Sequence, residues 1–293
     1  MDSSLLTIGL PVALAVIMLG LGLDLTPNDF SRVARRPRAV VVALACQVIL
    51  LPLVAFALVK GFGLAPLLAV GFMLLAASPG GTTANLYSHL FRGDVALNIT
   101  LTAINSVLAI ITLPLIANLA ISHFAPEEDN LGMQTGKLLQ VFAVVLLPVV
   151  IGMAIRRRSP EFAERMDKPV RIASAILLML VIAGAVLGER DNIGSYIRDV
   201  GLICVLFCTI SLIVGYVVPK LLGMTHPEAM ASGFEIGLHN STLAIAVALT
   251  VLDSAQMAVP PAVYGIVMFF LAAAFGALVS RRGPRETDPP PEG

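Results

Sequence analysis

Long apolar stretches separated by short charged or proline-rich connectors restrict the fold of this chain more than any other feature of its sequence. Most stretches hold close to 20 predominantly apolar residues, the length at which one helix crosses the hydrocarbon core of a bilayer. Of the 293 residues, 57% are hydrophobic and 13% are charged, whereas soluble domains carry about 25% charged residues. The sequence therefore predicts an all-α polytopic membrane protein surrounded by lipid, and it gives no sign of a nucleic-acid partner or an obligate protein partner.

We predict nine membrane-spanning segments. They lie at residues 5–23, 39–59, 65–90, 95–120, 138–155, 172–187, 201–219, 228–252 and 259–279. The connectors after the odd-numbered spans carry all but four of the 19 Lys and Arg residues, the exceptions being Lys60, Lys137, Arg190 and Arg198. Because basic connectors stay in the cytoplasm, the N-terminus is expected outside the cell and the C-terminus inside. An even number of spans would put half of this basic set on the wrong side.

Two of the predicted spans are interrupted by helix-breaking or polar residues. The third is broken at residues 78–83, which read SPGGTT, and the eighth at residues 233–240, which read GFEIGLHN. Proline and paired glycines weaken helical hydrogen bonding, and lipid offers no replacement partner. We therefore expect both breaks to be packed in protein or to line a cavity.

The two breaks occupy matching positions in the two halves of the chain. Spans one to four, at about residues 5–120, correspond to spans six to nine, at about residues 172–280, but begin on the opposite side of the membrane. Residues 138–155 form an extra span. Interrupted helices at corresponding positions of inverted halves indicate the midplane binding site of a secondary transporter. We predict one membrane transporter domain over residues 1–280, followed by a disordered cytoplasmic tail at 281–293.

Each break creates a half-helix whose first turn presents free N–H groups and a positive dipole end. Two such ends meeting at the midplane would suit a carboxylate or sulfonate. The polar residues at these half-helix starts are candidates for binding the substrate anion, although simple helix capping remains the alternative for each. They are Thr82, Thr83, Asn240 and Ser241.

Glu235 is the only acid well inside an apolar span, and buried charges in membranes usually mark pathways or binding sites. The carbonyl ends of the other two half-helices would add negative potential suited to a hard cation. Further oxygen donors are Gln47, Asn85, Asn98 and Thr102. Asn98 and Thr102 lie four residues apart and so share one helix face. Asn105 lies near that face, and for it we favour an interhelical hydrogen bond, an alternative that remains open for the other two.

Three segments, residues 79–85 (PGGTTAN), 92–97 (RGDVAL) and 235–241 (EIGLHNS), resemble the bile acid:sodium symporter family in its bacterial form. The likeness extends over nearly the whole chain. It implies a panel of spans one, five and six that moves against a core of the remaining spans. It also implies sodium-coupled symport of an organic anion, either bile-acid-like or a small keto or hydroxy acid, across a bacterial plasma membrane.

The resemblance further implies two sodium sites beside the crossing of the broken helices. The first would use Ala84, Asn85, Asn98, Thr102 and Glu235, and the second Gln47, Glu235, Ile236, Leu238 and His239. Two positions depart from the family pattern, because Ala84 stands where serine is usual and His239 where glutamine is usual. Since an imidazole is a poor ligand for a hard cation, the chain would bind one or two sodium ions, with the second site in doubt.

Other functions remain open at this stage. The same scaffold could couple to protons or work in efflux through Glu235 and His239, because an unperturbed histidine titrates near neutral pH. Arsenite efflux is disfavoured because neither break contains a cysteine for a thiophilic oxyanion. An intramembrane enzyme is a distant alternative: His239 and Ser241 are two residues apart and do not face each other on a helix. A membrane receptor that transports nothing would be distinguished by measuring flux.

Overall fold

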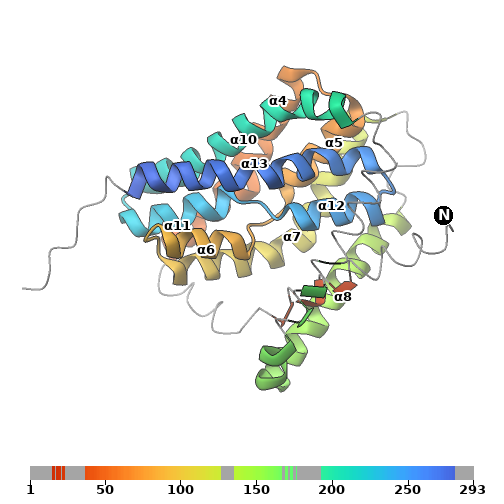
Figure 1. Cartoon of the computed structure of the whole chain (residues 1–293). Helices are drawn as coiled ribbons and strands as arrows, with labels where there is room; N and C mark the ends of the chain where they lie inside the picture. Colours follow the sequence, from red (N-terminus) through yellow and green to blue (C-terminus); the bar gives the residue numbers. More distant parts are fainter. Residues whose placement is uncertain are drawn as a thin grey trace, which may run out of the picture.

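The computed structural model describes residues 37–126, 135–166 and 193–280, together with the short pieces 15–16, 18–20, 22–23, 169–170, 172–173 and 176. Every regular element in the three long ranges is helical (Figure 1). In chain order they are α3 (Pro37–Ala45), η2 (Cys46–Leu50), α4 (Leu51–Phe62), α5 (Pro66–Ala77), α6 (Thr82–Leu90), α7 (Val95–Phe124), α8 (Thr135–Arg158), α10 (Ile193–Leu221), α11 (His226–Gly237), α12 (Ser241–Thr250) and α13 (Ala255–Ser280).

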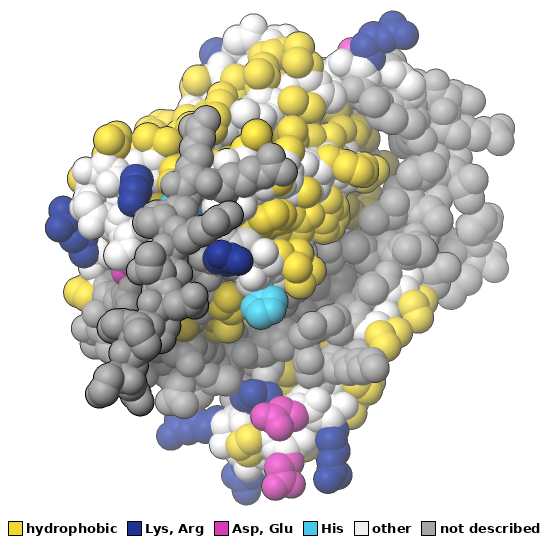
Figure 2. Space-filling model, turned by 60° about the vertical axis from the view of Figure 1, so that its left-hand side comes forward, with side chains coloured by type: hydrophobic (Ala, Val, Ile, Leu, Met, Phe, Trp, Pro, Cys, Tyr) yellow, Lys and Arg dark blue, Asp and Glu magenta, His cyan; other side chains and the backbone are white. Residues whose placement is uncertain are grey.

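Four helices in the described part of the chain are long and apolar enough to cross a membrane. They are Pro37–Phe62, Val95–Phe124, Arg198–Leu221 and Ala255–Ser280, and they cover the predicted second, fourth, seventh and ninth spans. Large apolar side chains lie exposed on their outer faces, such as Leu53 at 61% and Phe270 at 73%. In Figure 2, apolar side chains cover much of the described surface and most charged ones lie toward its edges. Such a surface is stable in lipid, so the chain is an integral membrane protein.

The first long helix contains one turn of π-helix, η2, between α3 and α4. Pro52 follows directly in the first turn of α4. Proline lacks an N–H group and clashes with the carbonyl four residues earlier, so a wider turn before it lets the helix continue. Gln47, a predicted ion ligand, lies in this π-helical turn and is buried.

The third and eighth spans are broken, as predicted, but both breaks are shorter than the sequence indicated. Helix is interrupted only at residues 78–81 and 238–240. The prediction that the second break begins at Gly233 was wrong, because α11 continues through Gly233 and Glu235 to Gly237. Its glycines instead permit close packing on α10: a Cβ added at either Gly233 or Gly237 would meet Leu212. Small residues at helix interfaces serve this purpose in membranes.

The four half-helices form the centre of the bundle. The two broken spans run in opposite directions, so that α6 and α11 lie together at one end and α5 and α12 at the other (Figure 1). Residues 68–77 of α5 and 229–237 of α11 are buried on every side. Gly71 of α5 lies so close to the main chain of Met257 in α13 that any Cβ would clash. The breaks are therefore enclosed by protein, and their irregular backbone is not exposed to lipid.

Helix α8 covers the predicted fifth span and ends in Arg156, Arg157 and Arg158. It lies to one side of the bundle and contacts it through α7 (Figure 1). The predicted first and sixth spans lie largely outside the described residues, as does the tail at 281–293. The count of nine spans, the inverted halves, the panel and core division, the domain bounds and the orientation of the termini all stay predictions.

Candidate functional site

The two breaks contact each other through their main chains. Gly80 and His239 form an isolated antiparallel bridge, and the Asn240 N–H donates to the Pro79 carbonyl oxygen at 2.7 Å. A buried N–H or C=O group without a partner is costly, and each break supplies partners to the other. The two interruptions are therefore one structural unit at the centre of the bundle.

Glu235 lies in the last turn of α11, fully buried beside this crossing. Thr102 donates its hydroxyl to Oε2 at 2.5 Å, and the Asn105 side-chain amide donates to Oε1 at 2.9 Å. The main chain of Gly80 also lies directly against the carboxylate. A Cβ at position 80 would overlap the carboxyl group of Glu235. Glycine is thus required here, because the extended backbone of the first break passes directly over the acid of the other span.

The surroundings of Glu235 favour a cation. Its hydrogen-bond partners are neutral, and no Lys or Arg in the described ranges forms an ion pair with it. It also lies at the carbonyl end of a half-helix, where the dipole adds negative potential. Asn105 Oδ1, on the amide that contacts Glu235, is buried without a hydrogen-bond partner, and so is Asn85 Oδ1 in the first turn of α6. A carboxylate with spare neutral oxygens is the ligand chemistry of hard cations.

Asn98 and Thr102 lie one turn apart on α7, as the spacing predicted. The Asn98 amide donates to Ser88 Oγ at 2.9 Å and to the Ala231 carbonyl at 2.8 Å, which joins α7 to α6 and α11. The interhelical role left open for Asn98 is therefore real, and it occupies only the nitrogen of the amide. Thr102 Oγ1 lies 3.5 Å from Asn98 Oδ1, a long hydrogen-bond distance, so this oxygen remains available as a ligand.

Gln47 and His239, predicted to share a second ion site, meet at the carbonyl oxygen of Ser78. Gln47 Nε2 donates to it at 3.0 Å, and His239 Nδ1 lies 3.1 Å from it. Because a carbonyl only accepts, the imidazole carries its proton on Nδ1 and presents a bare Nε2. Both that nitrogen and Gln47 Oε1 are buried without partners. Gln47 and His239, both from the second predicted ligand set, therefore lie side by side, with 3.5 Å between Gln47 Nε2 and His239 Nδ1.

The imidazole of His239 is fixed by aromatic rings. It stacks on Phe207 with a centroid distance of 5.4 Å and meets Tyr264 edge-on at 5.5 Å. Tyr264 in turn donates its hydroxyl to the Gly237 carbonyl at 2.8 Å. This hydrogen bond from α13 satisfies the carbonyl of the last residue of α11. The carbonyls of Ile236 and Leu238 are the predicted main-chain ligands.

Cys204 and Cys208, on one face of α10, are buried and act as packing residues with weak donor thiols. Cys208 lies 3.7 Å from the Gly237 carbonyl and Cys204 3.6 Å from that of Pro260. In the described ranges no group of three His, Cys, Asp or Glu side chains could hold a metal ion. The sodium ligands proposed from the sequence are instead neutral oxygens around one acid, a pattern of a different kind.

The predicted substrate residues lie at the starts of α6 and α12. Asn240 caps α12, because its Oδ1 accepts from the Leu243 N–H at 3.0 Å. Ser241 is buried and its hydroxyl has no partner, while Thr83 is half-buried. The Thr82 side chain lies outside the described residues. The capping alternative therefore holds for Asn240, whereas Ser241 keeps a free hydroxyl.

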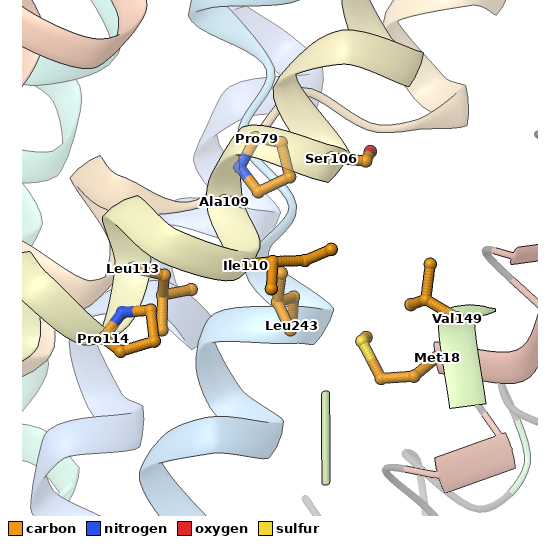
Figure 3. Close-up of a pocket in the computed structure, with 9 residues that line it drawn as sticks. All are labelled: Met18, Pro79, Ser106, Ala109, Ile110, Leu113, Pro114, Val149 and Leu243. Carbon is orange, nitrogen blue, oxygen red and sulfur yellow. The ribbon is translucent and has the colours of Figure 1, made fainter. Parts of the chain in front are cut away.

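A cavity adjoins the crossing on the side of α8 (Figure 3). One wall consists of Pro79 from the first break, Leu243 of α12 and Ser106 with its neighbours on α7. The opposite wall consists of Val149 of α8 together with Met18. As it stands it has room for little more than one water molecule, and the described lining is apolar except for Ser106. The cavity thus lies between the bundle that holds both breaks and a helix that packs outside it.

The interhelical hydrogen bond favoured for Asn105 is confirmed, with Glu235 of α11 as its partner, whereas sequence reasoning overlooked Tyr264 and the Ser78 carbonyl. Asn105 did carry a signal, because it lies three residues after Thr102 on the same face of α7. Its partner was the missing information. Tyr264 and the Ser78 carbonyl carried no signal, since a tyrosine in an apolar span and a main-chain oxygen are unremarkable without tertiary contacts.

Comparison with known proteins places this arrangement among transporters. Residues 11–196 match the Sodium Bile acid symporter family. The chain is 30% identical to the uncharacterized sodium-dependent transporter YocS of Bacillus subtilis, over 87% of this chain and 78% of that protein. It is 27% identical to the probable chloroplastic sodium/metabolite cotransporter BASS1 of Arabidopsis thaliana, over 94% and 68% respectively. It is 25% identical to the human ileal sodium/bile acid cotransporter, over 93% and 79%.

Proposed function

Because the chain belongs to the sodium bile acid symporter family and is a transporter rather than an enzyme, we propose that it imports a small organic anion together with sodium by alternating access. Its relatives are named as sodium-dependent carriers, which supports sodium as the coupling ion. The observation that carries the proposal is the buried, unneutralised Glu235 at the crossing of two broken helices.

Sodium binds first at Glu235 in this proposal, with oxygens from Asn85, Asn98 and Thr102. The support is chemical: every donor is an oxygen, one is formally charged, and the Asn85 oxygen is buried without a partner. Ala84 contributes no side-chain oxygen, so only its carbonyl is available. Binding of the cation neutralises the acid, which lowers the cost of keeping it at membrane depth.

The organic anion binds where the starts of α6 and α12 meet the cavity beside α8. Helix starts attract anions through free N–H groups, and Ser241 offers an unpaired hydroxyl close by. The apolar cavity walls suit the carbon skeleton of a carboxylate or sulfonate. Cation and anion sites then lie on adjacent sides of one crossing, so each charge favours binding of the other.

Alternating access requires the cavity to face each side of the membrane in turn. The cavity lies between the bundle, through α7 and α12, and Met18 with Val149 of α8. A relative movement of these two parts would open or close it without disturbing the hydrogen bonds of the crossing. This is the motion implied for a panel moving against a core.

Uptake into proteoliposomes tests the proposal directly. With an inward sodium gradient, we expect accumulation of at least one radiolabelled anion from a panel of keto acids, hydroxy acids and bile acids. Replacing sodium by potassium should abolish accumulation, because it removes the gradient of the coupling ion. Equal uptake in both salts across the panel would contradict sodium coupling, and uptake driven by a pH gradient alone would favour the proton-coupled alternative.

His239 bears on how many sodium ions are coupled. We expect a Hill coefficient of about one for sodium in wild-type uptake, since this coefficient cannot exceed the number of coupled sites. His239→Gln restores an amide oxygen beside Gln47, and we expect the coefficient to rise above one. Phe207→Leu, which removes only the ring stacked on the imidazole, serves as the control and should leave the coefficient unchanged. A coefficient near two in the wild type would show that the imidazole does not disable the second site.

A further inference from the structure

We propose that Asn105 belongs to the cation site: its amide nitrogen holds one oxygen of Glu235, and its amide oxygen is a ligand of the ion. The inference rests on the proposed function, in that the ion is sodium and Glu235 binds it. It adds to the site a residue to which the spacing of the sequence assigned only an interhelical hydrogen bond.

The orientation of the Asn105 amide follows from its partner. Asn105 is 3% exposed, and its Nδ2 lies 2.9 Å from Glu235 Oε1. A carboxylate oxygen only accepts, so the NH2 group must face it and the amide oxygen must point elsewhere. The flip state of this side chain is therefore determined by Glu235, and the position of Oδ1 follows from it.

The oxygen that results is a buried acceptor without a donor. Buried polar groups are nearly always satisfied, and each exception calls for an explanation such as an ion. Asn85 Oδ1 on α6 is a second such oxygen. Among the described residues Glu235 is the one fully buried acid and forms no ion pair with Lys or Arg, so a cation bound beside it and held by these oxygens would account for both.

Asn105 and Thr102 also fix the carboxylate from the same side. They lie three residues apart on α7, hence on one face, and they bind different oxygens of Glu235. The carboxylate therefore cannot rotate freely, and an ion beside it meets a preorganised set of oxygens. Preorganisation of this kind raises affinity by removing the cost of ordering the ligands on binding.

Sodium titration of purified full-length protein tests the proposal. The apparent melting temperature is followed against sodium chloride concentration, with choline chloride added to hold ionic strength constant. Ligand-induced stabilisation grows with ion concentration relative to Kd. Asn105→Leu keeps the size of the side chain and removes both polar atoms. We expect the half-saturating sodium concentration to rise by roughly tenfold or more, the effect typical of lost metal-site partners.

Thr100→Val is the matched control. Thr100 lies on the same helix at the same depth of burial, but its hydroxyl bonds only to the Ala96 carbonyl of its own helix. Its half-saturating sodium concentration should equal that of the wild type. An unchanged value in Asn105→Leu would overturn the inference while leaving sodium coupling intact. A wild-type protein that sodium does not stabilise would instead overturn the proposed function.

Ala84→Ser tests whether Asn105 is a ligand of the ion or only a hydrogen-bond donor to Glu235. It adds an oxygen at a buried position that the family resemblance assigns to the same ion site. In the Asn105→Leu background it should recover most of the lost affinity, and failure to do so would leave Asn105 only as a donor and overturn its role as a ligand. If Asn105→Leu does not fold, the sodium affinity of the single variant Ala84→Ser tests whether Asn105 is a ligand. It should shift sodium affinity by less than about threefold, because the coordination is already complete, whereas roughly tenfold tightening would show a ligand missing and overturn the inference.

Discussion

Glu235→Gln is expected to abolish sodium-dependent uptake and to weaken sodium binding by roughly 100-fold or more, because the site loses its only formal negative charge. The amide has nearly the shape of the carboxylate: its oxygen can accept from Asn105 while its NH2 group donates to the Thr102 hydroxyl. Without sodium, the melting temperature should stay equal or rise, since a neutral amide costs less to bury than an unpaired charge. Sodium-dependent thermal shifts and proteoliposome uptake measure the two effects separately.

Glu228→Gln provides the control within the same helix. Glu228 forms the capping box at the start of α11 with Thr225, at the opposite end from the crossing. Weakening this cap should cost up to about 1 kcal/mol of stability and leave the sodium response unchanged. If Glu235→Gln were to keep the sodium response of the wild type, the ion would have to bind elsewhere and the proposed function would lose its main support.

Gly80→Ala is expected to disrupt the Glu235 site directly. The added methyl group would overlap the carboxyl group of Glu235, in the extended segment that bridges to His239. Forcing the two apart should cost about 1–3 kcal/mol of stability and should displace the carboxylate from Thr102 and Asn105. We therefore expect a lower melting temperature together with loss of sodium-dependent uptake.

Gly81→Ala is a control one residue away. A Cβ at Gly81 meets nothing within 4 Å, and the backbone there is extended, with φ near −127°. The same added methyl group should leave melting temperature and uptake close to those of the wild type. Equal damage from both substitutions would mean that the glycines serve backbone flexibility in the first break, and the close approach of Gly80 to Glu235 would not be the cause.

These expectations share one physical basis, which is that each break completes the other. The first break supplies the Pro79 carbonyl to the second, and Gly80 of the first break packs against Glu235 in the last turn of α11, just before the second break. An ion that binds Glu235 therefore acts on both broken helices together. This gives sodium a route to influence the starts of α6 and α12, where the substrate is proposed to bind.

Much of this architecture could be predicted from local patterns. Apolar segments of membrane-crossing length predicted the helices, and the PGGTT and EIGLHNS segments predicted the two broken spans. The lone acid Glu235 and the four-residue spacing of Asn98 and Thr102 indicated the polar face of the site. These signals are strong because lipid tolerates neither a misplaced charge nor an unpaired backbone group.

Other features depended on contacts that sequence does not show. Gly233 looked like part of a break, but it lies in helix because α10 packs closely against it. Asn105 was weighed as an interhelical partner, and the identity of that partner as Glu235 changed its meaning. His239 was recognised as an unusual residue for an ion site, yet its tautomer followed only from the Ser78 carbonyl.

The sequence by itself determined that the chain lies in a membrane, that two of its spans are broken, and that one acid lies well inside an apolar span, because each of these follows from the composition of a single segment. Only the tertiary structure decided which groups meet. The approach of Gly80 to Glu235, the shared carbonyl of Ser78 and the unpaired oxygen of Asn105 each arise where segments more than a hundred residues apart, or on different helices, are packed at van der Waals distance, and no local pattern encodes that distance.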